Sequence, residues 1–242
     1  LALGGEATKR ESERMREGLF EVAAGFLQCE PSDLSLANGA VVGPKGPSGL
    51  TLAEIAAICH YRPYDSPLGK VPQMTIEESF VPSDVPYIAS NGVHAVHIEV
   101  DPDLGTVMLL DYWVVDDCGT VVNPLLVDEQ LRGGIVQGIG AALYEECLYS
   151  EDGQFTNGTL ADYVVPMACE MPDIHVGHVT TPTRSTGLGA KGVGEAGTVG
   201  APGAVRTALN DALSPLGARV TQQPFTASRI LEAVMAAEAA NK

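Results

Sequence analysis

A single carboxylate lies inside a glycine-rich run in the last quarter of this 242-residue chain. The run reads GAKGVGEAG over residues 189–197, and Glu195 is the only acid between Asp173 and Asp211. A carboxylate can take a proton from a reacting group, and small neighbours let the backbone pass close to a bulky ligand. Glu195 is therefore a candidate functional residue. The structural alternative is a solvated loop residue or an acid that sits favourably near a helix N-terminus.

Glycine also shapes the backbone around this acid. Seven of the seventeen residues in 187–203 are glycine, and such a segment lets backbone N–H groups approach an anion. The stretch GLGAKG at 187–192 matches the GxGxxG pattern. The dinucleotide fingerprint, however, needs a strand directly before it and a helix directly after it, and TTPTRST precedes the pattern while more loop follows. A nucleotide-binding fold is disfavoured, and a non-catalytic module that holds a nucleotide or another anion stays open as an alternative.

Composition excludes several classes of function. The net charge of −17 disfavours nucleic acid or an anionic membrane surface as a partner. The five cysteines form no CxxC pair, so the sequence predicts neither a disulfide framework nor a zinc site and favours a reducing, cytoplasmic location. We expect no membrane span and no signal peptide. The first residue is not Met, which indicates a processed, split or truncated chain.

Histidine pairs do not suggest a metal site either. His94 and His97 lie three apart on a predicted strand, as do His175 and His178. Residues three apart on a strand face opposite sides, so neither pair can easily share a metal. We predict no metal-ligating side chains in this chain.

The elements before the glycine-rich run fall into two predicted lobes. An amphipathic helix at 8–27, a hairpin around Asn38-Gly39 and a helix that begins with a capping box at Thr51 lie in the first sixty residues. Residues 61–90 carry five prolines and indicate an extended connector. We therefore expect a helix–hairpin–helix lobe with its connector over residues 1–84, and a second lobe over 85–242.

The second lobe mixes strands and helices without regular alternation, which predicts an α+β fold. The helix that begins at Pro124 contains four glycines, which indicate that another backbone or a ligand approaches it closely. The predicted elements are antiparallel strands at 94–101 and 106–117, a helix from 124, a strand at 173–181, a helix from about 202, a short strand at 217–223 and a terminal helix at 226–240.

Two long motifs together resemble a known family. The stretch DDCGTVVNPLLVDEQLRGGIVQGIGAALYEE at 116–146, followed by GAKGVGEAGTVGAPGAV at 189–205, is similar to the molybdenum-binding large subunit of the xanthine dehydrogenase, aldehyde oxidase and carbon monoxide dehydrogenase family. The resemblance runs from about residue 85 to the C-terminus and covers only the C-terminal part of that subunit. It implies the α+β molybdenum cofactor-binding domain of the xanthine dehydrogenase type.

The resemblance also implies a role for Glu195. The family's glutamate in GxGE falls on this residue, and there it is the general base beside the molybdenum. The family hydroxylates a carbon of an aldehyde or an N-heterocycle with oxygen derived from water. Carbon monoxide dehydrogenase-type oxidation at the same cofactor stays an alternative, although the loop that carries a copper-binding cysteine is not in this sequence.

Cofactor contacts are implied by the same resemblance. Gln137 in GGIVQGIG matches the family's pterin-contacting glutamine, with an ordinary polar helix residue as the alternative. Lys191, Gly192, Val193 and Gly194 match the segment whose backbone borders the cofactor. The Lys191 side chain would either add charge near a pyrophosphate or be a solvated lysine.

Three residues at the end of the second predicted strand are interpreted as structural. Asp116 and Asp117 are expected to position the turn that follows the second strand rather than to perform acid–base work, and Cys118 is expected to be a packed thiol rather than a nucleophile.

The implied assembly is larger than this chain. The resemblance implies molybdopterin, in its cytosine dinucleotide form, with molybdenum. It places 2Fe-2S clusters and FAD on partner chains, because this sequence has no iron–sulfur cysteine pattern and no flavin-binding segment. We therefore expect the remainder of the molybdenum subunit, an iron–sulfur subunit and an FAD subunit as partners, and no activity from this chain alone.

Overall fold

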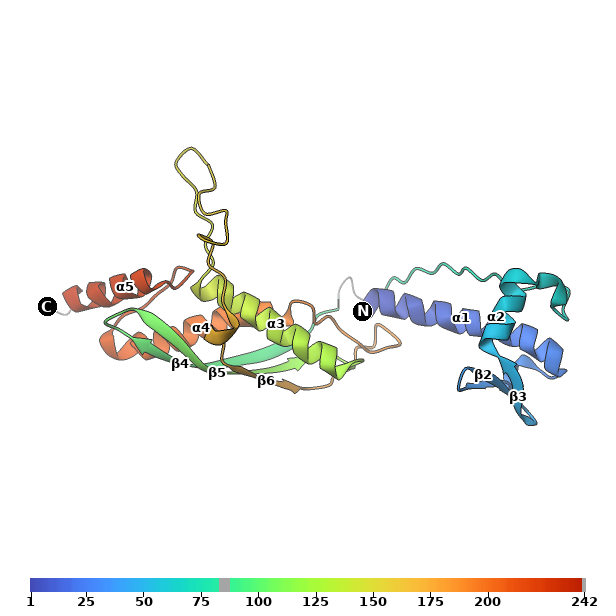
Figure 1. The fold of residues 1–242 in the computed structure, drawn as a ribbon. Helices are drawn as coiled ribbons and strands as arrows, with labels where there is room; N and C mark the ends of the chain where they lie inside the picture. The colour runs from blue at the N-terminus through green and yellow to red at the C-terminus, as the bar shows by residue number, and fades with distance from the viewer. Residues whose placement is uncertain (83–87, 241–242) are drawn as a thin grey trace. The chain divides into compact units, whose positions relative to one another are not determined.

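The computed structural model describes residues 1–82 and 88–240, and the chain divides into two compact units, Leu3–Ser83 and Asp84–Lys242 (Figure 1). The predicted lobe boundary between residues 84 and 85 lies outside the described residues. Helices and sheets occur in both units, which confirms the α+β class. The elements of the first unit are α1 (Ala2–Leu27), β1 (Ser35–Ala37), β2 (Ala40–Gly43), β3 (Gly46–Thr51) and α2 (Leu52–Tyr61).

The first unit confirms the predicted helix, hairpin and capped helix. Asn38 and Gly39 have φ angles of 49° and 73°, the left-handed conformation that a two-residue hairpin turn between β1 and β2 requires. Thr51 and Glu54 form both hydrogen bonds of the capping box at the start of α2. The strand β3, which the sequence did not predict, completes an antiparallel sheet in the order β1-β2-β3.

The proline-rich segment after α2 packs against the rest of the first unit. It runs back along α1, as Figure 1 shows for residues 70–82. Arg14 donates to Glu78 at 2.8 Å, and the Arg10 guanidinium lies 4.6 Å from the centre of the Phe80 ring. A Cβ at Gly18 would approach Pro72 to 2.8 Å. The proline-rich segment up to residue 82 is therefore a packed part of the first unit.

A three-stranded sheet in the order β4-β5-β6 forms the base of the second unit. The predicted antiparallel pair is confirmed, and β6 adds to β5 in parallel, a pairing that the sequence did not specify. The elements are β4 (Asn91–Asp101), β5 (Thr106–Asp117), α3 (Pro124–Leu143), β6 (Asp173–His178), α4 (Ala196–Leu213) and α5 (Ala227–Ala240).

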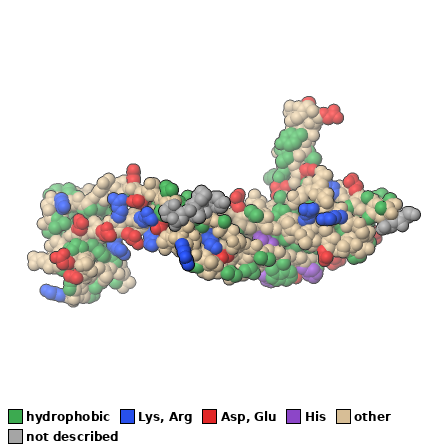
Figure 2. Space-filling model, turned by 180° about the vertical axis from the view of Figure 1, so that it is seen from behind, with side chains coloured by type: hydrophobic (Ala, Val, Ile, Leu, Met, Phe, Trp, Pro, Cys, Tyr) green, Lys and Arg blue, Asp and Glu red, His purple; other side chains and the backbone are tan. Residues whose placement is uncertain are grey.

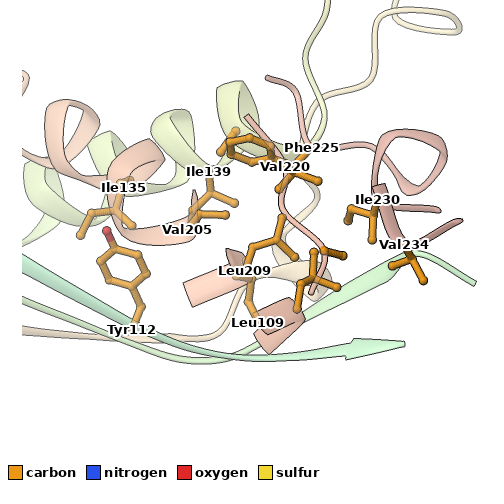
Figure 3. Packing of buried hydrophobic residues seen from close by; sticks show 14 of the residues in the cluster. Leu109, Tyr112, Ile135, Ile139, Val205, Leu209, Val220, Phe225, Ile230 and Val234 are labelled. Atoms are coloured by element: carbon orange, nitrogen blue, oxygen red, sulfur yellow. The ribbon is translucent and has the colours of Figure 1, made fainter. Parts of the chain in front are cut away.

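Alternating residues of β5 face the core of this unit. Tyr112 is fully buried and points toward Ile135 of α3, while Leu209 of α4 and Ile230 of α5 extend the same cluster (Figure 3). The other face of the sheet stays exposed. It carries hydrophobic and histidine side chains together (Figure 2), and the Trp113 and His175 rings stack on it at 5.7 Å.

Glycines allow α3 and α4 to pack closely. A Cβ at Gly138 would lie 2.8 Å from both the Cβ of Ala201 and the carbonyl oxygen of Thr198, and one at Gly134 would lie 3.1 Å from the nitrogen of Thr198. The prediction that another backbone approaches this helix is therefore confirmed at these two positions. At Gly133, by contrast, an added Cβ would meet open space.

Residues 145–167 form an arm between α3 and β6 that extends away from the rest of the second unit (Figure 1). Its two sides meet at an isolated bridge between Tyr149 and Phe155. No helix within residues 1–82 and 88–240 is long and apolar enough to cross a membrane.

Candidate functional site

Asp117 organises the turn at the end of β5. One carboxylate oxygen accepts the backbone N–H groups of Gly119 at 3.0 Å and Thr181 at 3.1 Å, and the other pairs with the Lys191 ammonium at 3.1 Å. Burial acts to raise the pKa of Asp117, but these hydrogen bonds outweigh it and hold that pKa well below its usual range. The prediction that Asp117 positions the turn is confirmed.

The first half of the glycine-rich loop is tied to this turn. The N–H of Thr120 donates to the Gly189 carbonyl at 3.0 Å, and the N–H of Lys191 donates to the Cys118 carbonyl at 2.7 Å. Gly189 has a φ angle of 69°, and a Cβ there would lie 2.7 Å from the Thr120 hydroxyl. Glycine is therefore required for backbone conformation and close approach at this position.

The second half of the loop, residues 192–195, has a different character. Within the part of the chain that the structure describes, the backbone N–H groups of these four residues donate to no protein acceptor. A Cβ at Gly192 or Gly194 would meet nothing within 4 Å. Gln130 of α3 holds this half in place by donating to the Gly194 carbonyl at 2.6 Å. This half of the loop therefore combines unpaired backbone N–H groups with open space beside its glycines.

Glu195 is the N-cap residue of α4, which begins at Ala196. The predicted helix start near Pro202 is wrong by about two turns, and Pro202 lies inside the helix. The packing of α4 against α3 explains this, because a Cβ at Gly197 would overlap the Leu131 carbonyl oxygen and lie 2.8 Å from the Ile135 nitrogen. The Glu195 carboxylate is exposed and has no hydrogen-bond or ion-pair partner among the described residues.

A cavity of about 340 Å³ lies beside this carboxylate. One wall is formed by the loop and the start of α4, including Glu195 and Ala196. The facing wall comes from the start of β4, including Asn91 and His94, and from Asp116 at the end of β5. The cavity therefore brings a carboxylate, an imidazole and a second acid to one site.

Asp116 is the unusual member of this set. It is 1% exposed, and within residues 1–82 and 88–240 its Oδ2 atom is the one buried side-chain nitrogen or oxygen without a hydrogen-bond partner. Burial raises the pKa of Asp116. We expected the Asp116 side chain to position the turn, but no hydrogen bond of its buried Oδ2 atom supports this role.

The structure brings some of the predicted residues together and separates others. Gly192, Val193, Gly194 and Glu195 line the cavity. Lys191 does not, and its largely buried ammonium pairs with Asp117, so the solvated-lysine alternative is wrong. Gln137 lies on an exposed face of α3, where its Oε1 accepts from the Thr198 hydroxyl at 3.3 Å. The cofactor contacts expected of these residues remain predictions.

Two cavity residues escaped the sequence reasoning. The sequence analysis considered His94 as a metal ligand and placed Asp116 in a turn in preference to acid–base work. Their shared signal was the alternation of β4 and β5, since Gly92 pairs with Asp116 and His94 with Val114 on one face of the sheet. Among the residues that the structure places, no three His, Cys, Asp or Glu side chains gather as a metal site.

Comparison with known proteins identifies the family. A family model described as molybdopterin cofactor-binding domain matches residues 1–172. The nicotine 6-hydroxylase large subunit of Paenarthrobacter nicotinovorans is 34% identical over 233 residues, which cover 96% of this chain and 28% of the relative.

Solved structures give the same result. The quinoline 2-oxidoreductase of Pseudomonas putida 86 matches with a TM-score of 0.78 and 33% identity, over 93% of this chain and 29% of that one. A Cu,Mo-CO dehydrogenase matches with a TM-score of 0.76 and 26% identity, over 97% of this chain and 29% of that one. This chain thus spans under a third of the length of these relatives. It belongs to the molybdopterin cofactor-binding domain family, within the molybdenum-binding large subunits that its two motifs resemble.

Proposed function

We propose that this chain is part of a molybdenum hydroxylase, and that Glu195 is the general base at its molybdenum centre. The observation that carries the proposal concerns the Glu195 carboxylate. It lines a cavity and has no hydrogen-bond or ion-pair partner among the described residues. A structural acid at a helix N-terminus would cap the helix, and Glu195 makes no such side-chain hydrogen bond.

The residues present fit the implied cofactor. The unpaired N–H groups of residues 192–195 and the N-terminus of α4 favour an anionic group such as an oxygen ligand or a phosphate. Gly192 and Gly194 leave open space where a side chain would otherwise project. The buried Oδ2 of Asp116 lacks the hydrogen-bond partner that a buried polar atom normally has.

The cofactor, when bound, supplies a centre that accepts two electrons from the substrate carbon. The residues of this chain supply the proton chemistry and the positioning. A carboxylate oxygen of Glu195 takes the proton from the attacking, water-derived oxygen. The backbone N–H groups of residues 192–194 would hold the cofactor. Lys191 keeps this segment in place through its ion pair with Asp117.

An N-heterocycle is the substrate class that we favour over an aldehyde. The names of two relatives, the nicotine hydroxylase and the quinoline oxidoreductase, refer to such rings.

We also propose the larger assembly. The chain spans 28% of the nicotine hydroxylase subunit, and the name of that relative denotes a large subunit. The remainder of the molybdenum subunit, an iron–sulfur subunit with 2Fe-2S clusters and an FAD subunit would complete the enzyme. We assign the cofactor the cytosine dinucleotide form and the complex a cytoplasmic location.

The test is the Glu195→Gln variant of the complex, which is purified from its native host by affinity capture of this chain. The substitution keeps the size and polarity of the side chain and removes the base. We expect turnover of an N-heterocycle to fall by at least about 10²-fold, the usual cost of losing a general base, with molybdenum content unchanged. Glu232→Gln on the exposed face of α5 is the matched control and should be neutral.

Two results would contradict the proposal in different ways. Near-normal turnover in Glu195→Gln would show that this carboxylate is not the base. If the purified wild-type chain contains no molybdenum and no other subunits copurify with it, the result would support the alternative of an anion-binding module.

A further inference from the structure

His94 lies between the core of the second unit and the helix that carries the proposed base. It is on the face of β4 that also presents Val96 to the core, and it lines the cavity beside Glu195. Desolvation lowers the pKa of the imidazole, so the neutral form is favoured at neutral pH, while an interaction with the backbone of Ala196 partly opposes the shift. The ring is thus a fixed, uncharged part of the cavity wall.

The core side of the ring is held by Tyr112. Its hydroxyl oxygen lies 2.8 Å from Nδ1 of His94, and the two rings meet edge to face with centres 5.9 Å apart. Tyr112 is fully buried, and burial raises its pKa well above the usual range, so the hydroxyl keeps its proton. The hydroxyl and Nδ1 share one hydrogen bond, whose donor depends on the tautomer of the ring.

The other side of the ring lies against the first turn of α4. A Cβ at Gly200 would overlap Cδ2 and Nε2 of His94, so only glycine lets the helix approach the ring this closely. Three residues earlier, on the neighbouring part of the same helix face, Gly197 lies against the α3 backbone of residues 131–135. The start of α4, directly after Glu195, is therefore packed against both α3 and His94.

We propose that His94 is a positioning residue, whose ring, held from the core by Tyr112, fixes the first turn of α4 and thereby the place of Glu195 in the cavity. The inference rests on the proposed role of Glu195 as the base. It assigns His94 no proton transfer and no contact with the reacting atoms. It explains why a polar ring, rather than an aliphatic side chain, stands at this point of β4, because the buried Tyr112 hydroxyl needs a partner on that side.

The variant that separates positioning from stability is His94→Asn in the purified complex. The asparagine amide can still meet the Tyr112 hydroxyl, but it lacks the part of the ring that lies against Gly200. We expect kcat to fall by about 10-fold or more with KM little changed, since a misplacement of about 1 Å in a catalytic group can cost 10²-fold. Thermal stability and molybdenum content should stay at the wild-type level. His97→Asn, on the opposite, exposed face of β4, is the matched control and should change neither kcat nor KM.

A readout that does not depend on activity accompanies the kinetics. Hydrogen–deuterium exchange of the Val199 and Gly200 amides should be faster in His94→Asn than in the wild type, and unchanged in the His97 control. Gly200→Ala should also lower kcat, because its methyl group collides with the ring, and His94→Asn in that background should relieve the collision and raise kcat again.

Each outcome decides the inference. Slower turnover with faster exchange at α4 supports it. Wild-type kcat and exchange in His94→Asn, while Glu195→Gln loses turnover, overturn it and leave the proposed function standing. If Glu195→Gln retains turnover, the proposed function fails, and the exchange data alone still show whether His94 fixes α4.

Discussion

A methyl group added to Gly197 tests whether α3 and α4 pack as closely as the site requires. Its carbon would overlap the Leu131 carbonyl oxygen and lie 2.8 Å from the Ile135 nitrogen and 3.0 Å from the Gly134 carbonyl carbon. These atoms belong to the α3 backbone, which cannot rotate away as a side chain can. Gly197→Ala must therefore push the two helices apart.

The size of the effect follows from two opposing contributions. Replacing an interior helical glycine by alanine gains up to about 1 kcal/mol from helix propensity alone. Overpacking a well-packed contact costs about 1–3 kcal/mol. Gly203 lies in the same helix, and a Cβ there would meet nothing within 4 Å, so Gly203→Ala keeps the gain without the cost. The free energies of unfolding of the two variants should therefore differ by about 1–3 kcal/mol, with Gly197→Ala the less stable.

Urea unfolding of the purified protein, followed by far-UV circular dichroism, measures this difference. Turnover should also fall in Gly197→Ala, because the displaced turn carries Glu195, and stay unchanged in Gly203→Ala. Equal unfolding midpoints for the two variants would refute the close packing of α3 on α4, and with it the argument that glycine positions the base.

Two further predictions concern the turn after β5 and the free thiols. Because the folded-state pKa of Asp117 is depressed, its stabilising contribution is complete above its unfolded pKa of about 3.9 and is lost as the pH falls toward the folded value. The unfolding midpoints of the wild type and Asp117→Asn, compared across pH, should converge below about pH 4; a constant gap would contradict the ion pairing. Burial raises the pKa of the Cys118 thiol, whereas Cys147 and Cys169 are exposed. Thiol labelling of the native protein followed by peptide mass analysis should therefore modify the two exposed cysteines first, and early modification of Cys118 would be the contrary result.

Local signals predicted most elements correctly. The capping box at Thr51, the Asn38-Gly39 turn and the β-branched and aromatic residues of 106–117 each depend on neighbouring residues alone, and each element formed as expected. The start of α4 was misplaced because residues 196–200 contain two glycines and weak helix formers, and the packing on α3 that stabilises them is not visible in the local sequence.

The predicted strand at 217–223 failed for a similar reason. The Asn210 side chain accepts the N–H of Val220 at 2.8 Å and donates to its carbonyl at 3.0 Å. Both backbone groups that a neighbouring strand would pair with are thus occupied. A β-branched residue flanked by turn signals is typical of a strand, and only the fold shows that a side chain from α4 takes the place of the sheet.

The candidate site was half predictable. Glu195 stood out because glycine surrounds a lone acid, a pattern that the sequence displays directly, and the family resemblance implied residues 192–194. The sequence did not predict the facing wall of the cavity. His94 and Asp116 come from strands about eighty to a hundred residues earlier in the sequence, and the pairing of β4 with β5 brings them close to the loop.

The division of the glycine-rich loop has a practical consequence for protein engineering. Its anchored half and the packed start of α4 set the position of Glu195 through backbone contacts, whereas the side chains of Ser90, Asn91 and the 81% exposed Val199 line the cavity and form no hydrogen bond with the loop. A combinatorial library at these three positions would therefore vary the shape and polarity of the cavity while leaving the carboxylate where it is. Directed evolution toward new ligands should begin there.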